Sequence, residues 1–100
     1  MAINYNLNVV TTTPYAVQNT DEVVFVNVPT TASVVLPTIA IGKNTGFYIK
    51  DYSGNASVNP IFITASGGAT INGVSFAILN VNYSHIQLIW DGSNWQTLTN

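Results

Sequence analysis

Charge is scarce in this sequence. Lysine and arginine together number 2 and aspartate and glutamate 4, so 6% of the 100 residues are charged, against roughly 25% in an ordinary soluble domain. The two lysines, Lys43 and Lys50, cannot form a surface that neutralises phosphates, which argues against nucleic acid as a partner. Charged side chains normally keep exposed strand edges apart. Because this chain has so few, we expect much of its surface to be covered in an oligomer.

Cysteine is absent and histidine occurs once, at His85. The absence of cysteine excludes disulfide frameworks, thiolate metal sites and cysteine nucleophiles. A zinc or copper site would need His85 together with carboxylates that are scattered along the chain. We therefore expect no metal and no other cofactor, and we interpret His85 as an ordinary residue at the start of a strand. One alternative stays open, in which copies of His85 meet on a threefold axis and bind a metal or an anion.

The sequence also lacks the patterns of catalytic sites. There is no Gly-x-Ser-x-Gly elbow, and the glycine pair at 67 and 68 is not followed by the Lys-Ser/Thr of a phosphate-binding loop. Asp21 and Glu22 are adjacent, so on a strand their carboxylates point to opposite faces. Asp51 and Asp91 stand at turn positions, where a carboxylate caps backbone N–H groups. We expect a protein that is not an enzyme.

A membrane span is not expected either. The first residues contain no basic stretch followed by an apolar run, and no later run is long enough to cross a bilayer. We therefore predict neither a signal peptide nor a transmembrane segment.

What the chain does contain is short β-forming segments between turn residues. About ten such segments, at spacings of about 8–12 residues, predict an all-β fold, an antiparallel β-sandwich that is jelly-roll-like or barrel-like. Within it, we expect residues 32–36 to pair back on residues 22–28 as a hairpin. No linker or change of composition divides the chain, so residues 1–100 are predicted to form a single domain.

The N-terminal segment alternates apolar residues with asparagine, as a half-buried strand does. Its apolar positions are Ile3, Tyr5, Leu7 and Val9. We expect residues 1–10 to form a partner-binding strand or arm that adds to the sheet edge of a neighbouring subunit. Deleting residues 1–10 is then expected to abolish binding and leave the core folded.

Aromatic residues near the C-terminus allow two interpretations. Trp90 and Trp95 flank a turn, and Tyr83 lies upstream. If the three rings are exposed, they could stack on sugar rings and form a glycan platform. If the two tryptophans face each other across a hairpin, they are a stabilising cross-strand pair. The symmetry about the turn favours the cross-strand pair.

Short motifs lie within residues 24–95, the first of them at Leu36 and the last ending at Trp95. In order they are Leu36-Pro37, Gly42-Lys43, Ile49-Lys50-Asp51, Ser53-Gly54-Asn55-Ala56, Ile61-Phe62-Ile63-Thr64, Gly67-Gly68, Ile71-Asn72-Gly73, Asn82-Tyr83 and Trp90-Asp91-Gly92-Ser93-Asn94-Trp95. Their order and spacing resemble the β-rich module that recurs in tail fibres, tailspikes and other virion surface proteins of tailed bacteriophages. The matched glycines and aspartates would be turn formers.

The resemblance implies a non-enzymatic homotrimer on the exterior of the virion, assembled in the host cytoplasm. Two roles fit it equally: a capsid decoration (cement) protein that binds the major capsid protein, or a fibre or spike component that contacts tail proteins. Several weak contacts of one trimer would together hold it on the particle. The alternative is a carbohydrate- or receptor-binding module at a tail fibre tip, with a host surface glycan as its ligand.

Overall fold

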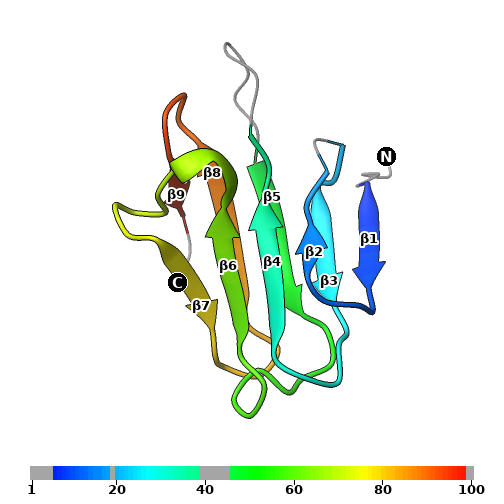
Figure 1. Ribbon diagram of the computed structural model, residues 1–100. Helices are drawn as coiled ribbons and strands as arrows, with labels where there is room; N and C mark the ends of the chain where they lie inside the picture. Colours follow the sequence, from blue (N-terminus) through cyan, green and yellow to red (C-terminus); the bar gives the residue numbers. More distant parts are fainter. Residues whose placement is uncertain (1–5, 19, 39–45, 99–100) are drawn as a thin grey trace.

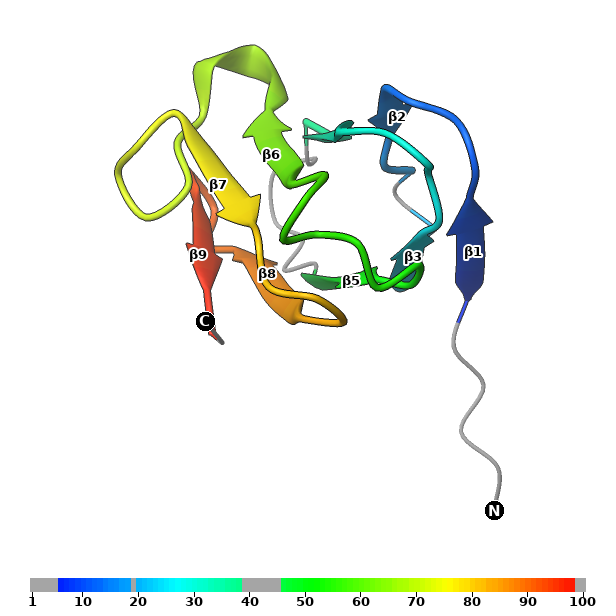
Figure 2. The same cartoon turned by 90° about the horizontal axis from the view of Figure 1, so that it is seen from below.

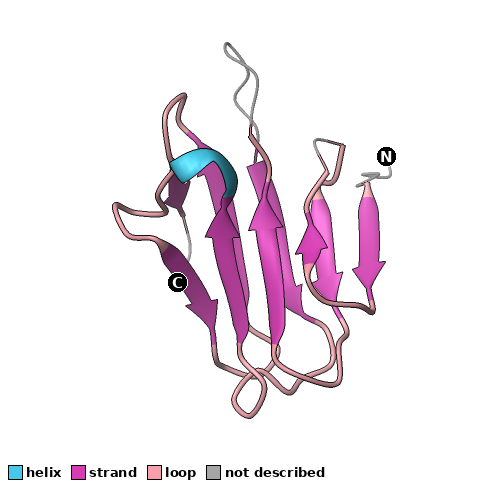
Figure 3. Ribbon diagram, in the orientation of Figure 1, coloured by secondary structure: helices cyan, strands magenta, loops and turns pink. Residues whose placement is uncertain are grey.

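The protein is an all-β domain made of two sheets. The computed structural model describes residues 6–18, 20–38 and 46–98, and every structural statement below concerns these residues. The elements are β1 (Leu7–Val10), β2 (Tyr15–Ala16), β3 (Val23–Val26), β4 (Ala32–Leu36), β5 (Gly46–Asp51), β6 (Ile61–Ala65), the 3-10 turn η1 (Ser66–Gly68), β7 (Phe76–Leu79), β8 (His85–Trp90) and β9 (Trp95–Thr97). The prediction of an all-β fold is confirmed (Figure 3).

The strands form a five-stranded sheet in the order β1-β3-β5-β8-β9 and a four-stranded sheet in the order β2-β4-β6-β7. The two sheets face each other (Figure 1), which agrees with the coarse prediction of a sandwich-like fold. In the described part of the chain, no helix is long and apolar enough to cross a bilayer.

The first six strands alternate between the sheets and pair in parallel. β3 lies parallel to β1 and to β5, and β4 lies parallel to β2 and to β6. Each strand therefore lies beside the strand two before it, and the chain winds as a short two-sheet solenoid (Figure 2). The antiparallel prediction is wrong for this part of the fold.

The predicted hairpin between residues 22–28 and 32–36 is also wrong, because β3 and β4 belong to different sheets. In both strands alternate residues are buried: Val24 and Val26 in β3, and Val34 and Leu36 in β4. The same alternation of buried and exposed residues arises in two cases. The turn between the strands can reverse the chain within one sheet, or it can carry the chain across to the facing sheet. The pattern of the residues alone does not distinguish the two arrangements.

The last third of the chain is antiparallel, as predicted. η1 contains two glycines with positive φ, Gly67 at 72° and Gly68 at 78°, a backbone region that glycine enters at little cost. After this turn, β7 pairs antiparallel with β6, β8 with β5, and β9 with β8. These three strands extend the two sheets, β8 and β9 in the larger one and β7 in the smaller one.

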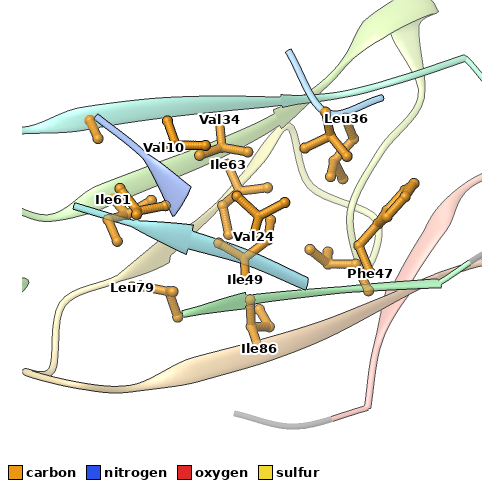
Figure 4. Close-up of a cluster of buried hydrophobic side chains, with 14 of the residues drawn as sticks. Val10, Val24, Val34, Leu36, Phe47, Ile49, Ile61, Ile63, Leu79 and Ile86 are labelled. Carbon is orange, nitrogen blue, oxygen red and sulfur yellow. The ribbon is translucent and has the colours of Figure 1, made fainter. Parts of the chain in front are cut away.

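The core lies between the sheets and is built from the inward positions of nearly every strand (Figure 4). Its members are apolar and buried: Val10, Val17, Val24, Val26, Val28, Ala32, Val34, Leu36, Phe47, Ile49, Ile61, Ile63, Ile71, Leu79, Ile86, Leu88 and Trp95. Burying each large side chain of this kind contributes about 1.5–3 kcal/mol. Because strand residues alternate between faces, this core also decides which side chains point outward.

Candidate functional site: the two outer sheet faces

The outer face of the five-stranded sheet carries two rows of side chains in register. One row runs Leu7, Val23, Tyr48, Gln87 across β1, β3, β5 and β8. The second row runs Val9, Phe25, Lys50, His85 across the same four strands. Each row is apolar at the β1 edge and becomes polar towards β8. The face therefore combines an apolar half with a cationic and hydrogen-bonding half.

An open pocket of about 350 Å³ lies where these halves meet. It is lined by Val23, Phe25, Tyr48, Lys50 and His85. Binding pockets for small molecules are commonly about 300–1,000 Å³, with apolar walls and a few polar groups that converge. The size and lining of this pocket match that description.

The ammonium group at the pocket is held in place by a loop. Lys50 Nζ donates to the Tyr83 carbonyl oxygen at 2.7 Å and lies 5.8 Å from the centre of the Tyr83 ring. An ammonium has three N–H donors, so this bond leaves two for other acceptors. Directly opposite Lys50 on β8 is the exposed His85.

The loop that holds Lys50 is itself fixed by a buried carboxylate. Asp51 is 2% exposed, and its Oδ2 accepts from the backbone N–H groups of Tyr83, at 3.1 Å, and Ala56, at 2.9 Å. Its Oδ1 accepts from the Gly54 N–H and the Ser53 hydroxyl, both at 3.2 Å. The sequence-based prediction that Asp51 caps a turn is confirmed, and the same side chain also joins that turn to the β7–β8 loop.

Apolar rings border the pocket. The rings of Phe25 and Tyr52 stack with their centres 5.2 Å apart and their planes 20° apart. Tyr52 is 47% exposed and Tyr48 is 37% exposed. This part of the face thus presents aromatic surface to solvent around a partly buried Phe25.

The outer face of the four-stranded sheet has a different chemistry. Its side chains, in register across the strands, are Ala16, Ser33, Val35, Phe62, Thr64, Phe76 and Ile78. None of these seven residues is charged. The rings of Phe62 and Phe76 lie 6.0 Å apart, and Phe76 and Ile78 are 47% and 40% exposed. This charge-free face therefore exposes aromatic and aliphatic side chains to solvent with no charged residue among them.

The predicted glycan platform does not form. Trp90 and Trp95 are register partners across the β8–β9 hairpin, with ring centres 5.4 Å apart, so the cross-strand interpretation is confirmed. Trp95 is fully buried, and the centre of its ring lies 5.5 Å from the centre of the Phe47 ring. A buried ring cannot stack on a sugar. Tyr83 lies in the β7–β8 loop, at the opposite end of β8 from the hairpin (Figure 1).

The predicted N-terminal arm falls only partly within the described residues, since Ile3 and Tyr5 lie outside them. Leu7 and Val9 belong to β1, which pairs along its length with β3 of its own chain and forms one edge of the sheet. Their side chains are about half exposed, whereas the neighbouring Val10 is buried. Deleting residues 1–10 would remove a strand and a core residue, so the expectation that the core stays intact does not fit the fold.

The remaining carboxylates hold backbone segments. Asp91 Oδ1 accepts from the N–H groups of Ser93 and Asn94, each at 2.9 Å, which confirms the predicted turn cap. These two backbone bonds, with the Gln96 side chain, lower the pKa of Asp91. Glu22 Oε1 accepts from the backbone N–H of residue 6 at 2.8 Å.

Asp21 is buried beside a tyrosine. Its Oδ2 accepts from the Tyr15 hydroxyl at 2.5 Å and from the Gln18 N–H at 3.0 Å. Burial raises the pKa of Tyr15 to about 12, and the hydrogen bond and negative charge of Asp21 add to the shift. Among the described residues, no three His, Cys, Asp or Glu side chains gather in a way that would hold a metal ion.

The chain matches no protein-family model and no curated protein sequence.

Proposed function

We propose that the protein is a non-enzymatic structural component of the exterior of a tailed-bacteriophage virion, assembled in the host cytoplasm and active as a homotrimer. It serves either as a capsid decoration protein on the major capsid protein or as a fibre or spike component beside the tail proteins. The observation that carries the proposal is the charge-free outer face of the four-stranded sheet, with Phe62, Phe76 and Ile78 among its members.

This face has the composition of a contact surface. The buried centre of a protein–protein interface is depleted of charged residues and enriched in aromatic ones. The four strands hold 2, 5, 5 and 4 residues. At about 4.8 Å between strands and about 3.3 Å per residue they cover roughly 250 Å², and an exposed patch of a few hundred Å² is often functional. A second copy or a capsid subunit packed on this face would remove Phe76 and Ile78 from water.

The open edges support assembly for a second reason. β1 and β9 are the edges of one sheet, and β2 and β7 are the edges of the other. Edge strands are normally protected by charged residues, bulges or a covering segment, and charge makes up only 6% of this chain. Packing against neighbouring subunits would cover these edges.

The placement on a phage particle rests on the resemblance of the turn motifs described from the sequence. The geometry is consistent with their proposed role as turn formers: Gly54, Gly73 and Gly92 have φ values of 79°, 82° and 106°. Asp51 and Asp91 cap the turns that contain Gly54 and Gly92. In this proposal the motif residues shape the loops, and the sheet faces make the contacts.

The test is a measurement of mass by light scattering, first on the free protein and then on protein mixed with capsids that lack it. We expect the mass of three chains, and co-sedimentation with the capsids if the role is decoration. Phe76→Asp should reduce the mass to that of one chain, because it places a charge in the proposed contact. Val58→Asp is the matched control: Val58 is 77% exposed and lies in a loop outside the face. A wild-type protein with the mass of one chain at micromolar concentration would overturn the proposal.

A second candidate function is favoured by the pocket on the five-stranded sheet. Its aromatic and apolar lining with converging polar groups suits a carbohydrate- or receptor-binding module at a tail fibre tip. In that role the ligand would be a host surface glycan. The two functions are compatible, because the pocket and the charge-free face lie on different sheets.

A further inference from the structure

We propose that the pocket on the outer face of the five-stranded sheet binds an acidic sugar, a pyranose ring that carries a carboxylate. The inference rests on the second proposed function, receptor binding, and gives that function a site and a ligand class. The site differs from the Trp90, Trp95 and Tyr83 platform suggested by the sequence, since its lining comes from β3, β5 and β8.

The apolar part of the pocket suits the face of a sugar ring. A pyranose has faces made of C–H groups, and the face of an aromatic ring carries partial negative charge that attracts them. Tyr48 is 37% exposed and stands beside Val23 in register. Phe25, which stacks on Tyr52, lines the same pocket. A sugar on this surface would contact aromatic and aliphatic side chains over one whole face.

The positive charge of Lys50 favours a ligand that carries a negative charge. Lys50 and His85 are register partners on the same face, and the five residues that line the pocket include no carboxylate. Asp51, the residue after Lys50, is buried on the other side of the sheet. A ligand carboxylate would meet an ammonium with two N–H donors left, and such charge-assisted hydrogen bonds are about twice as strong as neutral ones.

Lys50 is positioned before any ligand arrives. Its bond to the Tyr83 carbonyl fixes the end of a flexible side chain, and the Tyr83 backbone is held in turn by Asp51. The Tyr83 ring sits where a side chain at Gly54 would be: a Cβ there would lie 2.3 Å from Tyr83 Cζ. Such preorganisation reduces the entropy lost on binding.

Hydrogen-bonding groups around the pocket favour a sugar over a simple apolar acid. Tyr48 supplies a hydroxyl and His85 an imidazole, each able to donate and accept, and both line the same pocket. A sugar carries hydroxyls at its edges and C–H groups on its faces, so it can use the rings and these polar groups together. An alkyl carboxylate would use only the apolar surface and Lys50.

The chain offers a specific probe for the test, because His85 is its single histidine. Its imidazole proton resonances are followed by NMR at constant pH while glucuronate is added. We expect a saturable shift with a Kd on the order of 1 mM, typical of a ligand of this size. Glucose has the same ring without the carboxylate and should bind at least about tenfold more weakly. Equal shifts with glucose would overturn the choice of an acidic ligand, and equal affinity for acetate would overturn the choice of a sugar.

Variants locate the site. Lys50→Met keeps the aliphatic stem and should weaken glucuronate binding about tenfold, and Lys50→Gln should do the same. Val74→Ser changes an exposed apolar residue in the η1–β7 loop, outside both the pocket and the charge-free face, and should leave the affinity unchanged. If both Lys50 variants bind glucuronate normally, the proposal is wrong.

Light scattering on the same samples separates this inference from the assembly proposal. We expect Lys50→Met to keep the mass of the wild-type protein. A Lys50→Met protein that loses both glucuronate and its oligomeric state would place the pocket in a subunit interface and overturn the inference. A monomeric wild type that still binds glucuronate would overturn only the assembly proposal.

Discussion

Replacing Asp51 by alanine should be among the most destabilising single changes in this fold. The carboxylate is 2% exposed and accepts four hydrogen bonds, from the Ser53 hydroxyl and from the N–H groups of Gly54, Ala56 and Tyr83. A buried donor left without an acceptor costs about 1–3 kcal/mol. Some of the four donors will reach water after the change, so we expect a loss of about 4 kcal/mol.

Such a loss is large against the whole stability of a domain, which is commonly about 5–15 kcal/mol. For a chain of this length, 1 kcal/mol corresponds to about 4–8 °C in Tm. Asp51→Ala should therefore lower Tm by roughly 15–30 °C. Asp51→Asn keeps one carbonyl oxygen, which can serve either pair of donors, and should lose about half as much, roughly 2 kcal/mol.

Asp91→Ala is the matched control. Asp91 caps a turn of similar sequence, and it too accepts backbone N–H bonds, but it is exposed. The donors that it releases can bind water, so its Tm should change much less than that of Asp51→Ala. Thermal unfolding and urea unfolding, both followed by the fluorescence of the two tryptophans, measure Tm and the free energy of unfolding of the two variants. Equal losses for the two aspartates would refute the argument that burial of the unsatisfied donors decides the cost.

Three further predictions concern other parts of the fold. In an ultraviolet titration, Tyr15 should ionise near pH 12. Because its pKa is raised by folding, the stability it contributes is full below about pH 10 and is lost as the pH rises through 12. Tyr15→Phe should remove that alkaline dependence, and an unchanged dependence would show that the ionisation of Tyr15 is not its cause. Gly54→Ala combines a φ of 79° with a Cβ 2.3 Å from Tyr83, so urea unfolding should detect a loss of at least about 1 kcal/mol. Trp95→Ala should cost about 3–5 kcal/mol and remove the near-ultraviolet circular dichroism of the tryptophan pair; a stable variant would contradict its central place in the core.

The sequence predicts the strands of this protein well but not the way in which they pair. Alternation identifies β3 and β4 as strands with one buried face, since Val24 and Val34 are among their most buried residues. It does not reveal that they lie in different sheets. A regular solenoid would be visible as a repeat, but here the register partners Leu7 and Val23 are 16 residues apart, whereas Val23 and its next partner Tyr48 are 25 apart. Unequal coils leave no constant period to detect.

The sequence predicts those features of the candidate sites that depend on neighbouring residues in the chain. It does not predict the features that depend on which strands pair. The capping roles of Asp51 and Asp91 follow from the turn residues within a few positions of each. The pocket brings together Phe25, Lys50 and His85, which are neighbours only because β3, β5 and β8 lie side by side in one register. A shift of one residue in either pairing would turn a side chain from the outer face to the core. No pattern within a single strand contains that information.

The buried aspartate also links the stability of the fold to the proposed binding site. Asp51 ends β5, and the residue before it, Lys50, points to the opposite face and supplies the ammonium of the pocket. The Asp51 carboxylate accepts a hydrogen bond from the Tyr83 backbone N–H. The Tyr83 carbonyl oxygen in turn accepts a hydrogen bond from Lys50 Nζ. Asp51→Asn should therefore weaken glucuronate binding as well as stability, even at a temperature where the variant is fully folded. An Asp51→Asn protein with unchanged affinity would mean that the pocket does not depend on the β7–β8 loop for its geometry.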